Sequence, residues 1–343
     1  MVRLYYGEVF YKHRPSGYHP ENPGRLRIAY ESLERHGLHE KLEIVEPLFA
    51  REEDVFRVHS CWYVERVRTL SMAGGGLLDP DTYVSEGTWE AALAYVGSAI
   101  DGASRDEVSV VLGRPPGHHA GRDGAAMEAP TLGFCIFNGS AAAALRLADE
   151  GYKVLVLDFD VHHGNGTQEI LYREARVYHV DLHQDPSTLY PGTGWPWQTG
   201  DGDARGTKLN IVMPLGCGDN CYDYALDEII DILDRLGFKP NAIVFDAGFD
   251  AYMDDGLASM RATSNTYYKI AARIMDEYKP SRVVAVLEGG YSVGLEHGLP
   301  AFVAGLLGLD DPVQDTPTTS HPDRVRMLEA NIAELERHLG LRG

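Results

Sequence analysis

A short stretch near the middle of the chain combines carboxylates and imidazoles at a spacing that suits a metal ion. Asp158, Asp160 and His162 occupy every second position directly after the apolar run 154–157. If this run is an extended strand, side chains two positions apart point to the same side, so these three would converge. Two carboxylates and an imidazole are suitable ligands for zinc and for harder divalent ions. The alternative is a polar strand end whose Asp and Asn residues only cap the next helix.

A third carboxylate, Asp250, follows a later apolar segment, residues 242–247. In a parallel α/β sheet the carboxyl ends of the strands lie at one edge, and ligands bind there. Asp160, His162 and Asp250 could therefore bind zinc and leave its fourth position to water. Zinc in such a site lowers the pKa of its water to about 7.

Two histidines and a tyrosine could transfer protons and bind an oxyanion. His118 and His119 follow a rigid Pro-Pro-Gly loop at the end of another apolar segment, which makes them candidate general acid–base groups. Tyr291 stands on a Gly-Gly turn and could direct its phenol at a developing oxyanion. It could instead be a buried aromatic that bonds only backbone. Together with a metal, these groups indicate hydrolysis of an amide or ester.

The elements that must position these groups alternate as strand, loop and helix along all 343 residues, without a break in composition. We predict a single doubly wound α/β domain whose mainly parallel sheet of about eight strands is flanked by helices. This domain would span residues 1–343, with a catalytic core at about 1–310 and a helical tail at 321–343. Three glycines at 74–76 predict a loop that continues to Asp81.

The composition excludes some classes of partner. The chain carries 51 acidic and 31 basic residues, a formal net charge of −20. Such a field repels phosphate backbones, which argues against direct nucleic-acid binding, and it attracts cations such as polyamines. Four scattered cysteines do not form a disulfide scaffold. Neither a signal peptide nor a bilayer-spanning run is visible, so we expect a soluble, cytoplasmic protein that makes no membrane contact.

On these motifs the sequence resembles the histone deacetylase and acetylpolyamine amidohydrolase family, which shares its fold with arginase. The matching stretches follow the family's order and are His19–Arg25, Asp81–Gly87, Arg114–Ala120, Gly133–Cys135, Asp158–Gly166, Tyr190–Gly194, Ala247–Asp250 and Leu287–Tyr291. The Leu-Glu-Gly-Gly-Tyr and Gly-Phe-Asp forms are more similar to the class II and prokaryotic branches than to class I.

The resemblance implies a catalytic role for several of these residues. The implied zinc ligands are Asp160, His162 and Asp250. The same ligand set also accepts Fe(II) or Co(II). His119 would be the principal general base and acid, and His118 would assist it while hydrogen-bonded to Asp158. Tyr291 would polarise the scissile carbonyl together with zinc.

The resemblance also implies which residues contact the substrate. They are Arg25, Asp81, Gly133, Phe134, Tyr190, Leu257 and Gly289. Asp81 would hold the substrate backbone at the rim, and Arg25 matches an arginine beside the acetate exit channel. Phe134 would form one wall of an acyl-lysine tunnel. Tyr190 stands on the opposite wall, where the family usually has phenylalanine. Leu257 is at the tunnel mouth, where polyamine-specific relatives tend to have glutamate.

Three departures from the family pattern affect these expectations. Asn165 stands where class I enzymes have aspartate, and a neutral partner raises the pKa of His119 less than a carboxylate would. Asp181 replaces a serine in the implied site for K+ or Na+, which adds negative charge there. The implied residues of that site are Asp158, Asp160, His162, Asp181 and Leu182. The segment 121–132 is longer than in many relatives and could narrow the pocket mouth or form a homo-oligomer contact.

Four functions fit these features to different degrees. The leading prediction is a zinc-dependent deacetylase that acts on acetylated lysine side chains of proteins or on a small acylated amine. The runner-up is an acetylpolyamine amidohydrolase, which the acidic charge favours and Leu257 disfavours. A binuclear manganese ureohydrolase like arginase lacks evident carboxylates for its second metal. A catalytically inactive acyl-lysine binding module would not need Tyr291 as an oxyanion donor.

Overall fold

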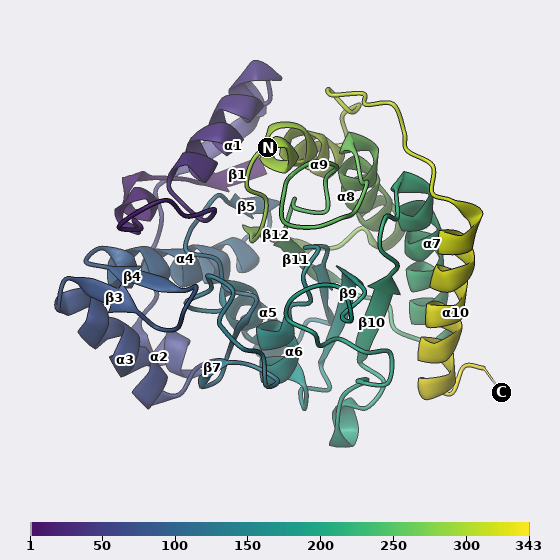
Figure 1. Cartoon of the computed structure of the whole chain (residues 1–343), viewed down its shortest axis with the longest axis horizontal. Coiled ribbons are helices and arrows are strands. Elements are labelled where there is room, and N and C mark those ends of the chain that lie inside the picture. Colours follow the sequence, from purple (N-terminus) through teal and green to yellow (C-terminus); the bar gives the residue numbers. More distant parts are fainter. Residues whose placement is uncertain (1, 343) are drawn as a thin grey trace.

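Eight parallel strands form the central sheet of this protein, whose computed structural model describes residues 2–342 (Figure 1). Their order is β10-β9-β8-β11-β12-β5-β1-β2. The strands are β1 (Val2–Tyr5), β2 (Leu42–Val45), β5 (Ser109–Val111), β8 (Val154–Asp158), β9 (Val177–Gln184), β10 (Lys208–Met213), β11 (Ala242–Ala247) and β12 (Arg282–Leu287). This arrangement confirms the predicted doubly wound α/β domain.

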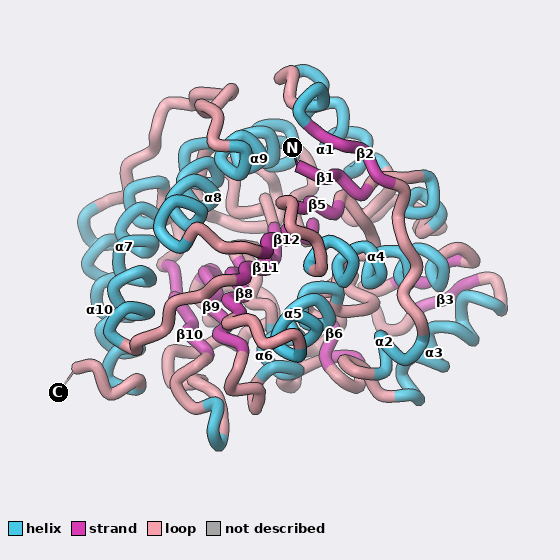
Figure 2. Tube along the Cα trace, turned by 180° about the vertical axis from the view of Figure 1, so that it is seen from behind, coloured by secondary structure: helices cyan, strands magenta, loops and turns pink. Residues whose placement is uncertain are grey.

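Helices cover both faces of the sheet, as Figure 2 shows with α8 and α9 on one face and α4 and α5 on the other. The α-helices are α1 (Gly24–Arg35), α2 (Glu52–Phe56), α3 (Cys61–Met72), α4 (Thr88–Ala103), α5 (Gly139–Asp149), α6 (Asn165–Leu171), α7 (Asp219–Arg235), α8 (Ser264–Tyr278), α9 (Leu299–Leu307) and α10 (Pro322–His338). Shorter helical turns lie at Glu8–Lys12, His39–Lys41, Gly202–Ala204 and Gly294–Gly298.

The core lies between these layers. Every residue of β8 and of β11 is buried, because parallel strands with helices on both faces have no solvent side. Helix α5 is rich in alanine, which lets it pack closely on β8 and β11. Its N-cap is Asn138, whose side chain accepts a hydrogen bond of 2.8 Å from the Ala141 N–H. Such a cap fixes where the helix starts above the sheet.

The loop predicted from the glycines at 74–76 is wrong in part. Gly75–Leu77 forms strand β3, which pairs antiparallel with β4 (Tyr83–Ser85). Gly75 has φ +114°, and a Cβ there would lie 2.6 Å from the Val84 carbonyl oxygen. Glycine therefore permits a close backbone approach in this hairpin, where it was expected only to interrupt structure. A second small hairpin joins β6 (Ala120–Gly121) to β7 (Gly124–Ala125).

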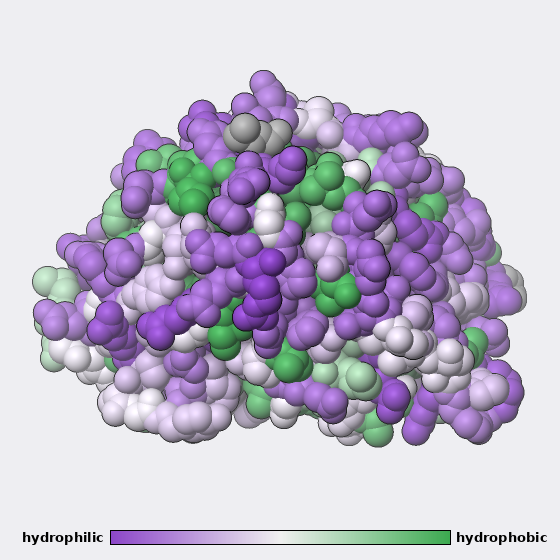
Figure 3. Space-filling model, turned by 90° about the horizontal axis from the view of Figure 1, so that it is seen from above, coloured by the Kyte–Doolittle hydropathy of each residue, from purple (hydrophilic) through white to green (hydrophobic). Residues whose placement is uncertain are grey.

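The tail packs against the domain. Helix α10 contacts β10 and α7, and the Asn331 side chain donates to the Val212 carbonyl at 2.8 Å. The core boundary near residue 310 stays a prediction. Within residues 2–342, none of the helices combines the length and apolarity needed to cross a membrane. The face seen in Figure 3 is mostly hydrophilic, with hydrophobic residues in separate small groups.

The strand order brings the predicted reactive residues together. Strands β8, β11, β12 and β5 are consecutive neighbours in the sheet, and all run in the same direction. Their carboxyl ends therefore lie side by side at one edge. The segments that follow these four ends contain the histidine pair, the aspartates and the tyrosine singled out in the sequence.

Candidate active site

Asp160, His162 and Asp250 converge at the carboxyl ends of β8 and β11. One potential ligand atom from each lies within 4.8 Å of the other two. The His162 Nδ1 is 3.0 Å from Asp160 Oδ1 and 3.0 Å from Asp250 Oδ2. All three side chains are buried. The structure thus brings together the three residues that the sequence predicted as a ligand set.

The donor set fits a divalent cation. Asp250 Oδ2 is buried and accepts no hydrogen bond, because the His162 Nδ1 at 3.0 Å is not oriented to donate to it. This is costly for a carboxylate oxygen unless a cation or proton compensates it. A Cβ at Gly289 would lie 2.4 Å from Oδ2 of both aspartates, so glycine leaves these oxygens room to converge. Burial, followed by the charge of Asp160, raises the pKa of Asp250 to about 6. Two carboxylates and an imidazole at this separation are a typical zinc-binding set.

His118 and His119 face partners of different charge. The His118 Nδ1 lies 2.9 Å from Asp158 Oδ2, whereas the His119 Nδ1 lies 2.7 Å from Asn165 Oδ1. Burial alone would lower the pKa of His118, but the charges of Asp158 and Asp160 raise that pKa well above its usual value. Burial, followed by the positive charge of His118, lowers the pKa of His119 well below its usual value. Opposite pKa shifts of this kind suit a charged His118 beside a neutral base.

The orientation of Asn165 decides which nitrogen of His119 is free. The Asn165 Nδ2 donates to the Ala126 carbonyl at 2.9 Å, so Oδ1 faces His119 as an acceptor. We infer that His119 carries its proton on Nδ1 and leaves Nε2 with a lone pair. This is the tautomer that a general base needs.

Tyr291 is held by contacts to its ring and its backbone. The Arg25 guanidinium lies over the ring, 4.9 Å from its centroid, and donates to the Gly290 carbonyl at 2.6 Å. Arg25 also donates to the Glu288 carbonyl and to Glu21. Protein acceptors thus occupy the guanidinium, and the predicted place of Arg25 beside an exit channel stays a prediction. Burial, followed by the charge of Asp250, raises the pKa of Tyr291 well above 10, so its phenol keeps a proton to donate.

Phe134 and Tyr190 flank the histidines and Tyr291. The Tyr190 and His119 ring centroids are 4.9 Å apart, and those of Phe134 and Tyr291 are 6.1 Å apart. The Tyr190 hydroxyl donates to the Thr131 carbonyl at 2.8 Å, so its polar tip is satisfied within the protein. A Cβ at Gly133 would lie 2.5 Å from His119 Cδ2, which requires glycine there. These contacts fit the predicted aromatic walls.

Two further predicted substrate contacts, Asp81 and Leu257, are at least partly exposed. The Asp81 carboxylate accepts from the Thr131 hydroxyl at 2.6 Å and from the Thr82 hydroxyl at 2.8 Å, which fixes its direction. Leu257 is 37 % exposed, on a loop whose Ser259 N–H donates to Gln184 at 3.1 Å. The assignment of both residues to the substrate rim stays a prediction.

The residues of the implied monovalent-cation site lie on neighbouring strands. Asp158 and Asp181 are register partners across β8 and β9. The His183 Nδ1 lies 2.6 Å from Asp181 Oδ1, and the Gly164 N–H donates to Asp181 Oδ2 at 2.8 Å. Leu182, the next residue, is buried. The carboxylate that replaces the family's serine is therefore paired with groups of the protein, and the cation site stays a prediction.

Sequence reasoning gave no role to several residues that support the site. Glu288 accepts hydrogen bonds from the Gly117 N–H at 2.8 Å and from the His118 N–H at 3.1 Å. Asp255 accepts from the Tyr291 N–H at 2.8 Å. The signal for Glu288 was a glutamate directly after an apolar strand. Asp255 had no comparable signal, because it lies in an irregular loop.

A buried ion pair also escaped prediction. Arg114 donates from Nε and from Nη2 to the two carboxylate oxygens of Glu21, at 2.6 Å each, and both residues are fully buried. The two residues belong to separate matching stretches of the sequence. A buried glutamate in one motif and a buried arginine in another could have suggested the pair.

Comparisons with known proteins agree with this geometry. A family model described as the histone deacetylase domain matches residues 19–306. A probable deacetylase of Archaeoglobus fulgidus is 37 % identical over 354 residues, which cover 98 % of this chain and 95 % of that protein. A histone deacetylase-like amidohydrolase of Pseudomonas aeruginosa is 37 % identical over 285 residues, or 80 % of this chain and 73 % of that protein.

A solved structure has a similar fold. The crystal structure of the HDA15 HD domain superposes with a TM-score of 0.85 at 29 % identity, and the match covers 99 % of this chain and 96 % of the other. The similarity therefore includes the whole sheet and the helices on both of its faces.

Proposed function

This chain belongs to the histone deacetylase family, and from that membership we propose that it is a zinc-dependent deacetylase of N-acyl-lysine side chains. The observation that carries the proposal is the buried convergence of Asp160, His162 and Asp250, in which Asp250 Oδ2 has no hydrogen-bond partner. A cation among these atoms would compensate two neighbouring carboxylates. Beside it, the lowered pKa of His119 favours the neutral imidazole and the raised pKa of Tyr291 favours the protonated phenol, the forms that amide hydrolysis requires.

His119, Tyr291 and His118 would each have a different role in amide hydrolysis. Bound zinc would polarise the scissile carbonyl and lower the pKa of a water molecule. His119 Nε2 would accept the proton of the attacking water and then return it to the leaving amine. The Tyr291 phenol would donate a hydrogen bond to the carbonyl oxygen as negative charge develops there. His118, charged and paired with Asp158, would hold positive charge next to the reacting groups without giving up its own proton.

The aromatic walls support an acyl-lysine substrate. Phe134 and Tyr190 lie next to Tyr291 and His119, so a narrow, unbranched chain that passed between them would reach the reacting groups. Such a slot would also exclude bulk water, which strengthens electrostatic interactions inside the site. We propose that the partner is an acetylated lysine of a protein or a small acylated amine. We also propose that K+ or Na+ binds near Asp158 and Asp181 as a structural ion.

Acetylpolyamines are the second candidate substrate. The net charge of −20 favours them, since a polyamine retains ammonium groups after one end is acetylated. Against them, Leu257 would offer an apolar contact if it lies at the rim, where a second ammonium group would favour a carboxylate. We therefore place acyl-lysine first.

The test combines metal analysis with substrate comparison. Purified protein should contain about one zinc per chain, and it should hydrolyse an acetyl-lysine peptide faster than acetylputrescine or acetylspermidine. His119→Ala should abolish hydrolysis, whereas His338→Ala, which removes a half-exposed imidazole on α10, should leave it unchanged. Hydrolysis of none of the three substrates by zinc-loaded protein would refute the proposal. A preference for acetylspermidine would support the second candidate.

A further inference from the structure

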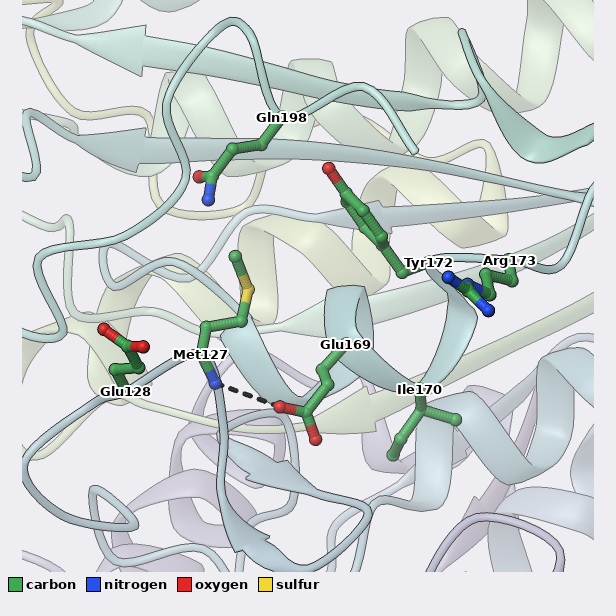
Figure 4. Close-up of a pocket in the computed structure, with 7 residues that line it drawn as sticks. All are labelled: Met127, Glu128, Glu169, Ile170, Tyr172, Arg173 and Gln198. Carbon is green, nitrogen blue, oxygen red and sulfur yellow. Dashed lines mark hydrogen bonds between the residues drawn. The ribbon is translucent and has the colours of Figure 1, made fainter. Parts of the chain in front are cut away.

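We propose that Glu169, to which neither the sequence nor the comparisons assign a role, is a positioning residue for the general base His119. It would act through the turn 126–129 and through Asn165. The inference rests on the proposed function only where it names His119 as the base. Figure 4 shows Glu169 on helix α6, beside the segment that contains Met127 and Glu128.

The Glu169 carboxylate bonds the β6–β7 hairpin at two points, the turn between its strands and the segment just after β7. Its Oε1 accepts from the Arg122 N–H at 3.0 Å, and its Oε2 accepts from the Met127 N–H at 3.0 Å. Hydrogen bonds to an ionised carboxylate are stronger than those between neutral groups. A Cβ at Gly121 would lie 2.4 Å from Glu169 Oε1, so this glycine makes room for the carboxylate.

The turn at residues 126–129 has an unfavourable backbone conformation, so it needs stabilising contacts from outside the turn. Met127 has φ +52° and Glu128 has φ +61°, values that residues other than glycine rarely adopt. Two consecutive residues with positive φ are typical of a type I′ turn, which is usually built from Asn and Gly. The Ala129 N–H donates to the Ala126 carbonyl at 2.9 Å and closes the turn. Glu169 supplies the additional contact at Met127.

The turn at residues 126–129 also orients Asn165. The same Ala126 carbonyl accepts from Asn165 Nδ2 at 2.9 Å, and Asn165 Oδ1 lies 2.7 Å from His119 Nδ1. Asn165 and Glu169 are four positions apart on α6, so they share one face of the helix. Both therefore reach the same hairpin. If the turn relaxed, the Asn165 amide could rotate and present Nδ2 to His119, which would favour a proton on Nε2 and remove the lone pair of the base.

Kinetics of three single variants test this relay first. Glu169→Ala should lower kcat about tenfold, a common effect of losing a supporting hydrogen-bond partner, with KM and bound zinc unchanged. Glu169→Gln keeps an acceptor oxygen and should restore part of kcat. Glu169 and Arg173 both line a surface hollow of about 590 Å³. Arg173→Ala is the matched control, because Arg173 forms its ion pair with Asp201. It should match the wild type.

A double-mutant cycle separates the relay from a purely structural role. In an Asn165→Ala background, Glu169→Ala should lower kcat less than about twofold further, because the group through which it acts is gone. Losses that multiply in the double variant would overturn the relay. A loss of thermal stability with an unchanged kcat would overturn it as well.

The tautomer of His119 gives a readout that does not depend on turnover. In zinc-loaded protein labelled with ¹⁵N-histidine, His119 should be an Nδ1–H tautomer in the wild type and a mixture with Nε2–H in Glu169→Ala. Pure Nδ1–H in both proteins would overturn the inference. If the wild type failed to deacetylate any substrate while this tautomer change appeared, the proposed function would fail and the positioning role of Glu169 would stand.

Discussion

The rings of His118 and His119 lie against each other with centroids 4.0 Å apart, yet one faces a carboxylate and the other a neutral amide. This asymmetry sets their charges. A protonated His118 repels a second proton on its neighbour, and the pKa of His119 falls well below its usual value because burial and that repulsion act in the same direction. His119 should therefore remain a competent base in mildly acidic solution.

Asn165→Asp should move the acidic limb of the kcat/KM profile to higher pH. A buried carboxylate at Asn165 stabilises the imidazolium of His119, so its pKa rises and a higher pH is needed to free the base. We expect a shift of about one to three pH units, the usual effect of a carboxylate in contact. The measurement is the pH dependence of kcat/KM on an acetyl-lysine peptide.

A matched control adds the same charge elsewhere on α6. Ile170→Glu places a carboxylate at the surface hollow that Ile170 lines together with Glu169 and Arg173, and the pH profile should stay in place. An Asn165→Asp profile that coincides with the wild type would show that another group governs the acidic limb.

Removal of any one proposed metal ligand should abolish bound zinc and activity together. Asp160→Ala, His162→Ala and Asp250→Ala each take away one of three protein donors, and structural relaxation cannot replace a buried ligand. Zinc per chain would be measured by elemental analysis next to turnover. Glu329→Ala, which removes an exposed carboxylate on α10, should keep both. Stoichiometric zinc in any of the three ligand variants would show that the ligands are misassigned.

Tyr291→Phe should retain zinc and the fold but lower kcat by about 10²–10³, the usual effect of losing one oxyanion donor. The ring can still pack under Arg25, so the substitution removes only the hydroxyl. KM should change little, because the hydrogen bond strengthens in the transition state. Tyr18→Phe, at a side chain that is 98 % exposed, serves as the control. A loss in kcat below about threefold would indicate that Tyr291 is only a packed aromatic.

The sequence predicted the strands that carry the site better than the groups that hold it in place. Strand β8 was predictable because its apolar run ends in Asp158, and the grouping of Asp160 with Asp250 followed from the rule that parallel strands share a carboxyl edge. The Ala126 carbonyl that orients Asn165 was not predictable, since a backbone group has no signature in the sequence. Its position depends on a turn that Met127 would not be expected to form, given its preference for negative φ.

The Arg114–Glu21 pair should matter for stability. All five N–H donors of Arg114 have partners: two carboxylate oxygens of Glu21, two backbone carbonyls and the Tyr83 hydroxyl. Arg114→Met would leave Glu21 buried without its main counter-charge and should cost about 3–5 kcal/mol of unfolding free energy. Arg146→Lys, at a surface pair with Glu150, should change it by less than about 0.5 kcal/mol.

The contribution of the Arg114–Glu21 pair to the free energy of unfolding should decrease at low pH. Burial alone would raise the pKa of Glu21, but the charge of Arg114 outweighs it and holds that pKa well below its usual range. A carboxylate whose pKa is depressed in the folded state stabilises the fold above its unfolded pKa, about 4.3 for glutamate, and this stability is lost as the pH falls. The difference between wild type and Arg114→Met in urea unfolding should therefore shrink below about pH 4. A difference that stayed constant to low pH would show that lost packing, not charge, causes it.

Leu257→Glu should raise kcat/KM for acetylspermidine relative to an acetyl-lysine peptide. If Leu257 lies at the substrate rim, its apolar side chain suits the neutral backbone beside an acyl-lysine. A polyamine instead carries a further ammonium group that a carboxylate would attract. Because Leu257 is 37 % exposed, solvent screens the new pair, and we expect a change in the ratio of up to about fivefold. Raised salt should reduce that gain, as it does for exposed charge pairs.

The isosteric variant Leu257→Gln separates charge from shape. It has the length of glutamate without its charge, so it should leave the ratio of the two rates near that of the wild type. Equal losses on both substrates in Leu257→Glu would indicate that Leu257 only packs beneath its loop. If Leu257→Glu left the ratio of the two kcat/KM values unaltered, the substrate rim would lie elsewhere, and residues 121–132 would be the next segment to test. That result would also remove the argument that ranks acyl-lysine above polyamine.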